Sequence, residues 1–399
     1  MTNVTVLGAG AWGTAFGQVL ADAGNSVTMW AIEPEIVEGI RDHHHNGVRL
    51  PSVKVLPSNM TATGDRAEAV ANADIVIVAI AAQFARVALA EFKGLIPETA
   101  LVASLMKGIE RTTGKRMDEV VMETLDLPAD RFAAISGPNL SKQIADREPA
   151  ATVVACENLD NARKIAAACT TDYFRAFVTR DVIGLEMCGS LKNVVALAVG
   201  MARGAGYGEN TAAMIETRGL AELTALGEAA GADPKTFAGL AGVGDLIATC
   251  GSPLSRNYTF GSNLGKGLSV EEATKVSNGV AEGVPTTDAV VALGKQYGVP
   301  TPLATAMSTC FPMASPARRC CPNFSAKASA KNKLSATSRL QIRPHFQVRS
   351  FFYFSRHCDC VKRQSECVNR QSPYISAIIV NLYKNSLIVI SLIVIRQSD

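Results

Sequence analysis

Two lysines and one aspartate stand at positions where they could move a proton. Lys192 opens the apolar helical stretch 191–202, and Lys107 follows an apolar strand-like run. Asp245 lies in the apolar stretch 239–246, where a carboxylate needs a cationic partner. Burial lowers the pKa of a lysine and a nearby carboxylate opposes that shift, so the three residues predict an acid/base catalyst. Taken alone, Lys107 also fits a solvated loop lysine.

A serine, a guanidinium and an amide follow one another at Ser255, Arg256 and Asn257. The arginine fork can bind a phosphate or carboxylate through two parallel hydrogen bonds, and the amide adds a further donor. The same tripeptide is also typical of an N-cap serine followed by a surface arginine. Both interpretations stay open for the tripeptide by itself.

Three glycines near the start of the chain have the spacing of a dinucleotide-binding turn, Gly8-Ala9-Gly10-Ala11-Trp12-Gly13. The strand-like run 4–7 precedes them, and the apolar-periodic segment 11–22 follows as a helix. Gly8 permits a tight turn, Gly10 lets backbone N–H groups approach a pyrophosphate, and Gly13 lets the helix pack on its strand. This context predicts a bound dinucleotide.

The elements that must position these residues alternate between strand and helix in the first part of the chain. Strand-like segments are 4–7, 26–30, 73–80, 100–105, 132–136 and 151–156. Such alternation predicts parallel strands covered by helices on both faces, with ligands at the carboxyl edge of the sheet. Polar or glycine-bearing turns follow the strands at 81–83, 107–108 and 136–139, which are expected at that edge.

After residue 184 the pattern changes to Ala-, Leu- and Gly-rich helix. Helices are predicted over 191–202, 211–230, 270–275 and 287–297, with breaks at 204–208, 242–244 and 252–253. We therefore expect an α/β fold, with a Rossmann-type doubly wound sheet over residues 1–184 and an all-α substrate domain over residues 185–310.

The last part of the chain differs from the rest in charge and pattern. Residues 311–399 hold 14 of the 39 Lys and Arg but 3 of the 36 Asp and Glu, so their net charge is +11 and that of residues 1–310 is −8. We interpret this segment as a disordered, frame-shifted or otherwise unselected translation; the alternative is a basic arm for nucleic acid or membrane. Its apolar end, 374–395, contains Asn381, Lys384 and Asn385 and makes a poor membrane span.

Cysteine and histidine usage excludes some classes of site. Five cysteines are scattered singly through residues 1–310, without a CxxC pair, which is typical of reduced thiols in a cytoplasm. No signal peptide is expected before the first strand. The run His43-His44-His45 cannot turn all three rings to one ion, so it predicts a polar loop and no metal site.

Together these motifs resemble the bacterial-type NAD(P)-dependent glycerol-3-phosphate dehydrogenases over residues 1–310. Eight motifs occur in order, namely 8–14, Lys107-Gly108, Ile135-Ser136-Gly137-Pro138, 189–196, 217–222, 242–250, 255–261 and 280–283. The resemblance implies reversible hydride transfer between NAD or NADP and sn-glycerol 3-phosphate or dihydroxyacetone phosphate, in support of glycerophospholipid synthesis. The resemblance outweighs the non-functional interpretations of the single motifs, namely a solvated loop lysine at Lys107 and a surface arginine at Arg256.

The resemblance also implies a role for each matching residue. Lys192 is expected to be the general acid/base at the substrate C2 oxygen, supported by Asp245, with Lys107 near the same oxygen. Arg256 and Asn257 are expected to hold the phosphate. The other residues implied to line the substrate pocket are Gly137, Asn139, Asn193, Thr249 and Ser255. The implied cofactor contacts are Gly8, Gly10, Ala11, Trp12, Gly13, Ile32, Lys107, Arg256, Val280 and Glu282.

The chain departs from the family pattern in several respects. Ile32 and Glu33 stand where many relatives have an arginine for the 2′-phosphate of NADP, which leaves the choice of NAD or NADP open. Asn139 replaces a small hydroxyl residue. The family's last helices after residue 310 are replaced by the basic segment.

These observations leave two alternative functions and several expectations about partners. The alternatives are another two-domain Rossmann dehydrogenase that acts on a hydroxy acid, and a nucleotide-binding but inactive product of the altered C-terminus. The expected partner is a small phosphorylated substrate, with no nucleic acid and no stable membrane insertion. A cytoplasmic location is expected, and a homodimer is an open prediction.

Overall fold

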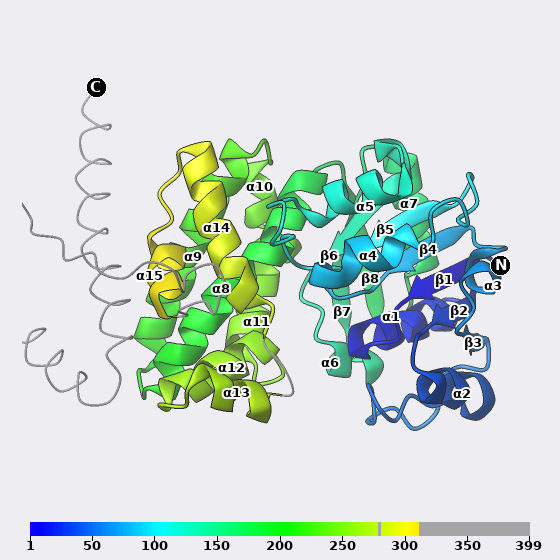
Figure 1. Cartoon of the computed structure of the whole chain (residues 1–399), viewed down its shortest axis with the longest axis horizontal. Helices are drawn as coiled ribbons and strands as arrows, with labels where there is room; N and C mark the ends of the chain where they lie inside the picture. Colours follow the sequence, from blue (N-terminus) through cyan, green and yellow to red (C-terminus); the bar gives the residue numbers. More distant parts are fainter. Residues whose placement is uncertain (278–280, 311–399) are drawn as a thin grey trace, which may run out of the picture.

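A computed structural model describes residues 1–277 and 281–310 of the chain as a sheet domain followed by a helical domain (Figure 1). The predicted cofactor contact Val280 and the segment 311–399 lie outside the described residues. The predicted domain boundary after residue 184 falls in the first turn of the long helix α8, Val182–Gly204. The last strand, β8, ends at Thr179.

The sheet has eight strands in the order β3-β2-β1-β4-β5-β6-β7-β8. Their bounds are β1 Asn3–Leu7, β2 Ser26–Trp30, β3 Met60–Thr63, β4 Ile75–Val78, β5 Leu101–Ser104, β6 Phe132–Ser136, β7 Ala150–Ala155 and β8 Phe174–Thr179. The order steps outward from β1 in both directions, which is the doubly wound arrangement that the alternating pattern predicts.

The expectation of parallel strands throughout is wrong at one pair, because β7 runs antiparallel to β6. Only residues 137–149 join these strands, and the five-residue helix α6, Ser141–Ala145, is too short for a full crossover to the other end of the sheet. The sequence patterns also miss β3 and β8. The first is four residues long with two threonines, and the second is an edge strand that exposes Arg175, so neither has a long apolar run.

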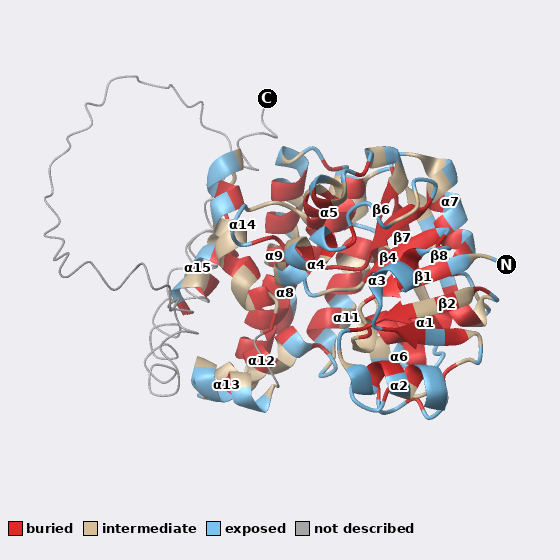
Figure 2. Cartoon of the chain, turned by 45° about the vertical axis from the view of Figure 1, so that its right-hand side comes forward, coloured by how far each residue is buried: buried red, intermediate tan, exposed pale blue. Residues whose placement is uncertain are grey.

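Helices cover both faces of the sheet, and the sheet separates two hydrophobic cores, one on each face. Alternate residues of β4 show the division: Ile75 and Ile77 face one core, and Val76 and Val78 face the other. The second core continues into the helical domain through α8, which Figure 2 shows buried along its length. The helices of the sheet domain are α1 Ala11–Asp22, α2 Pro34–His43, α3 Arg66–Val70, α4 Ala85–Ala90, α5 Met117–Leu125, α6 and α7 Leu159–Ala168.

The helical domain is built around α8. The surrounding helices are α9 Glu209–Ala229, α10 Pro234–Phe237, α11 Asp245–Gly251, α12 Arg256–Gly265, α13 Val270–Val276, α14 Gly283–Tyr297 and α15 Pro302–Cys310. The break predicted at 242–244 is instead a π-helical turn, Leu240–Gly244, which leads directly into α11. Such turns inside helices often occur at functional sites.

A buried glutamate of α9 holds α15 in place. Glu222 of α9 accepts hydrogen bonds from the backbone N–H groups of Leu303, at 2.8 Å, and Ala304, at 3.1 Å, and so caps the start of α15. Burial raises the pKa of Glu222 to about 7, and these two hydrogen bonds oppose the shift. The capping glutamate belongs to the motif 217–222.

One described helix, α8, is long and apolar enough to cross a membrane, and most of it is buried inside the helical domain.

The five cysteines within the described part of the chain are free and buried. The predicted polar loop at residues 43–45 begins inside α2, because His43 is the last residue of that helix and His44 follows in the left-handed conformation.

Helices α8 and α12 approach so closely that their contact requires glycine. A Cβ atom on Gly200 would lie 2.2 Å from the carbonyl oxygen of Tyr258, and one on Gly261 would lie 2.2 Å from that of Leu197. Both clashes are with backbone atoms, which cannot turn away as a side chain can. The glycines therefore set the distance at which α12 presents its first residues to α8.

We predict that Gly200→Ala lowers the free energy of unfolding by roughly 1–3 kcal/mol, because the added methyl group forces the two helices apart. Urea denaturation followed by circular dichroism measures the change. Gly208→Ala is the matched control, because a Cβ at Gly208 meets nothing within 4 Å. Equal stability of the Gly200 and Gly208 variants would contradict this account of the helix contact.

Candidate active site

The glycine-rich turn after β1 has the shape that a dinucleotide needs. Gly8 has φ +112°, and a Cβ there would lie 2.7 Å from the Ala79 carbonyl oxygen. A Cβ on Gly13 would lie 2.1 Å from the Gly8 oxygen, so this glycine lets α1 pack on its strand. Gly10, in contrast, faces open space and is the N-cap of α1, whose N-terminus has no side-chain cap. A pyrophosphate fits where Gly10 leaves this space, against the free N–H groups of Ala11 and Trp12.

A buried carboxylate held by two lysines forms the centre of the site. Lys192 Nζ lies 2.6 Å from Asp245 Oδ1, and Lys107 Nζ lies 2.7 Å from Asp245 Oδ2. Lys192 also donates to Thr249 Oγ1 at 2.5 Å, and Lys107 donates to the Gly137 carbonyl at 3.2 Å. The structure thus brings together five of the predicted site residues, from α8, α11 and the turns after β5 and β6.

The electrostatics of this cluster suit proton transfer. Burial lowers the pKa of Lys192 to about 8; Lys107 adds to the shift, and Asp245 opposes it. Burial acts to raise the pKa of Asp245, but the two lysines outweigh it and hold that pKa below its usual value. With both lysines charged, the cluster has one net positive charge, and Lys192 is poised to lose a proton near physiological pH.

Close packing of α8 against the sheet edge brings the lysines together. A Cβ on Gly189 would lie 2.9 Å from Ser136 Oγ and 3.3 Å from Lys107 Cγ, so this position has no room for a larger residue. Ser190 Oγ donates to the Gly108 carbonyl at 3.1 Å and ties α8 to the same turn. These two residues place Lys192, one turn further along α8, beside the end of the sheet.

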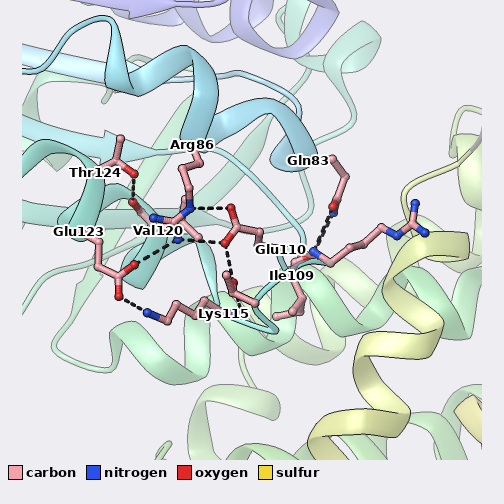
Figure 3. A network of polar contacts seen from close by, with 10 residues as sticks. Gln83, Arg86, Ile109, Glu110, Lys115, Val120, Glu123 and Thr124 are labelled. Carbon is pink, nitrogen blue, oxygen red and sulfur yellow. Dashed lines mark hydrogen bonds and ion pairs between the residues drawn. The ribbon is translucent and has the colours of Figure 1, made fainter. Parts of the chain in front are cut away.

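A polar network that the sequence analysis missed holds the chain just after Lys107 (Figure 3). Arg86 of α4 forms two hydrogen bonds of 2.9 Å with Glu110, and a third of 3.1 Å with Glu123 of α5. Gln83 donates to the Ile109 carbonyl at 2.8 Å. The hydrogen bonds from Arg86 lower the pKa of the buried Glu110 against the effect of burial. The pairing of Arg86 with Glu110, 24 residues apart, has no local sequence signal.

The start of α12 supplies the predicted anion-binding residues. Ser255 is the N-cap and its Oγ accepts a hydrogen bond from the Tyr258 N–H at 3.3 Å, so the N-cap interpretation is correct for this side chain. Arg256 is exposed, and within the described residues its guanidinium has no ion pair or hydrogen bond. Asn257 is buried, donates to Asn193 Oδ1 at 2.9 Å and accepts from the Gly283 N–H at 2.8 Å. It therefore joins α12 to α8 and α14.

Three other predicted site residues have defined positions in the structure. Glu282 reaches the Lys107 turn, with Oε2 lying 3.8 Å from the place of a Cβ on Gly108. Burial raises the pKa of Glu282, the charge of Arg256 opposes the shift, and its buried Oε2 has no hydrogen-bond partner among the described residues. Asn139 donates to the Ala151 carbonyl and accepts from Thr152, so it holds the turn between β6 and β7. Ile32 is exposed just after β2.

No group of three or more His, Cys, Asp or Glu side chains within residues 1–277 and 281–310 is arranged to hold a metal ion. The described site offers two lysines and a carboxylate, and the glycine-rich turn 8–13 offers space for a dinucleotide.

Comparisons with known proteins place the chain in a family. The models for the N-terminus and the C-terminus of NAD-dependent glycerol-3-phosphate dehydrogenase match residues 3–162 and 181–319. The chain belongs to the NAD-dependent glycerol-3-phosphate dehydrogenase family. A relative from Bifidobacterium longum, glycerol-3-phosphate dehydrogenase [NAD(P)+], is 87% identical over 306 residues, which are 77% of this chain and 92% of that protein.

More distant members of the family match a similar share of this chain at lower sequence identity. A glycerol-3-phosphate dehydrogenase [NAD(P)+] from Corynebacterium kroppenstedtii is 50% identical over 78% of this chain and 94% of its own length. The crystal structure of glycerol-3-phosphate dehydrogenase from Coxiella burnetii has 32% identity and a TM-score of 0.72, covering 77% of this chain and 93% of that one. The resemblance seen in the sequence motifs and the predicted fold class are confirmed.

We predict that Asp245→Asn lowers the pKa of Lys192 further below about 8, because it removes the carboxylate that favours the ammonium. NMR titration of protein with ¹⁵N-labelled lysine side chains measures this pKa. Lys142, an exposed lysine whose pKa is raised by Asp146, serves as the control resonance and should not move. A Lys192 pKa that is unchanged by the substitution would contradict the electrostatic account of the cluster.

Proposed function

We propose that the chain interconverts sn-glycerol 3-phosphate and dihydroxyacetone phosphate with NAD(H) or NADP(H), and so supplies glycerophospholipid synthesis. The observation that carries the proposal is the buried Asp245 between Lys192 and Lys107, at the same sheet edge as the dinucleotide cradle. The bound dinucleotide would supply the acceptor or donor of hydride. The N–H groups of Ala11 and Trp12 would hold its pyrophosphate in the space that Gly10 leaves open, and Glu282 would offer its buried carboxyl oxygen.

Lys192 acts as the acid/base in this scheme. As a neutral amine it has two N–H bonds, which it donates to Asp245 and Thr249, and its lone pair is left for the proton of the C2 hydroxyl. As an ammonium it has a third N–H to give to the C2 oxygen in the reverse direction. Lys107 places a cationic group near this oxygen and stabilises the negative charge that develops there.

The substrate phosphate is held at the start of α12. Arg256 presents a guanidinium without a partner in the described part of the chain, which is free to bind phosphate oxygens in a bidentate manner. Asn193 and Asn257 join the catalytic helix to this point, so the distance from the phosphate to Lys192 is fixed by the packing of α8 against α12. The proposal places the phosphate of the three-carbon substrate at Arg256 and its C2 oxygen at Lys192.

An assay with dihydroxyacetone phosphate and each reduced cofactor tests the proposal. We expect turnover with the phosphorylated substrate and much slower turnover with unphosphorylated analogues. Oxidation of unphosphorylated hydroxy acids at rates matching glycerol 3-phosphate would favour the other dehydrogenase class. Dinucleotide binding without turnover would favour an inactive product of the altered C-terminus.

We further propose that the protein works in the cytoplasm, without nucleic acid or membrane insertion, and forms a homodimer. The buried free cysteines in the described part of the chain agree with a reducing compartment. Light scattering coupled to size exclusion measures the oligomeric state directly.

We predict that Lys192→Ala lowers kcat by roughly 10²-fold or more, because the reaction loses its proton donor and acceptor. Binding of the dinucleotide, measured by fluorescence titration, should persist. Lys164→Ala removes an exposed lysine on α7 and is the control. Unchanged turnover in the Lys192 variant would remove this residue from the mechanism.

We predict that Arg256→Ala chiefly raises KM for glycerol 3-phosphate, by about 10-fold or more, because a charge-assisted contact with the phosphate is lost. Steady-state kinetics at saturating cofactor measure the change. Arg163→Ala, at an exposed position on α7, controls for the loss of surface charge. A fall in cofactor affinity alone would show that Arg256 does not hold the phosphate.

A further inference from the structure

An ion pair lies just after the end of β2, the strand next to β1 and its glycine-rich turn 8–13, which is called the cradle below. Arg49 Nη2 is 2.8 Å from Glu33 Oε1. Glu33 comes 20 residues after Gly13 and is the N-cap of α2. In doubly wound folds an acidic residue at about this distance accepts the 2′-hydroxyl of the adenine ribose, whereas a nearby arginine accommodates the 2′-phosphate of NADP. Here both side chains are present and bound to each other.

The loop that carries Arg49 is fastened to the cradle itself. Asn46 is buried, and its amide donates to the Ala9 carbonyl at 3.0 Å and to Thr14 Oγ1 at 2.9 Å. Its carbonyl oxygen Oδ1 in turn accepts the backbone N–H of Arg49 at 3.1 Å. Asn46 therefore ties Arg49 to the turn that holds the pyrophosphate.

A cavity of about 330 Å³ opens beside Arg49. Its lining includes Ala11, from the start of α1, and Arg49 with Leu50, Pro51 and Ser52 from the fastened loop. The arginine thus borders space that is continuous with the first turn of the pyrophosphate-binding helix. Ile32 adds an exposed apolar side chain next to Glu33.

We propose that Glu33 and Arg49 form a cofactor selector, in which Glu33 accepts the ribose 2′-hydroxyl of NAD(H) and Arg49 leaves Glu33 to bind the 2′-phosphate of NADP(H). The inference rests on the proposed function, since it concerns the dinucleotide of that reaction. It assigns the 2′-phosphate to an arginine from a loop 16 residues beyond Glu33, at a place where Ile32 has no charge to offer.

Exchange of partners at this pair costs little. The side chains of Arg49 and Glu33 are 49% and 32% exposed, and an exposed ion pair contributes only about 0–1 kcal/mol to stability. A phosphate has more negative charge than a carboxylate and accepts two hydrogen bonds from the guanidinium. Glu33 repels the same phosphate, so the pair sets a balance between the two cofactors.

Titration calorimetry of the whole chain with 2′,5′-ADP and with ADP tests the selector without any turnover. Arg49→Gln is expected to raise the Kd of 2′,5′-ADP by about 10-fold or more and that of ADP by less than about 3-fold, because only the first ligand has the 2′-phosphate. Glu33→Gln is expected to lower the Kd of 2′,5′-ADP. Arg41→Gln, which removes an exposed arginine paired with Asp42 on α2, is the charge control and should leave both values unchanged.

An unchanged ratio of the two Kd values in Arg49→Gln would overturn the selector. An equal effect of Arg41→Gln and Arg49→Gln would also overturn it, because general surface charge would then explain the change. A failure of the unaltered chain to bind ADP or NADH would instead overturn the proposed function, and the selector with it.

Discussion

The structure depends on one buried carboxylate, Asp245, that forms ion pairs with two lysines. Asp245 is 2% exposed, and without Lys107 and Lys192 it would be a bare charge in an apolar setting. Removal of Asp245 would leave two ammonium groups without a counter-charge, and removal of both lysines would leave a bare carboxylate, so the three side chains act as a unit. Burial lowers the pKa of Lys192 to about 8, Asp245 opposes this shift and Lys107 adds to it, so Lys192 can exchange a proton near physiological pH.

Packing makes this unit possible. Lys107 lies in the turn after β5, Lys192 lies on the central helix α8, and Asp245 follows a π-helical turn. The two domains must therefore meet to complete the cluster of three side chains. Gly189 permits the contact between α8 and the Lys107 turn, and Gly200 permits the contact between α8 and α12. The core that runs from one sheet face into the helical domain keeps these surfaces together.

Much of this could be predicted from sequence, because strong local patterns carry it. The glycine-rich turn, helix α1 and the pairing of Asp245 with lysine follow from spacing and from the cost of a buried charge. Sequence could not show that both lysines share Asp245, since three segments distant in the chain create that contact. The reversed β7, the short β3 and the link between Arg86 and Glu110 also depend on tertiary pairing, which leaves no local periodicity.

The pH dependence of kcat/KM in both directions tests the central claim most directly. If Lys192 is the acid/base, oxidation of glycerol 3-phosphate should rise with pH through about 8, because it needs the neutral amine. Reduction of dihydroxyacetone phosphate should fall over the same range, because it needs the ammonium. Parallel profiles in the two directions, or profiles without a transition near pH 8, would contradict the account.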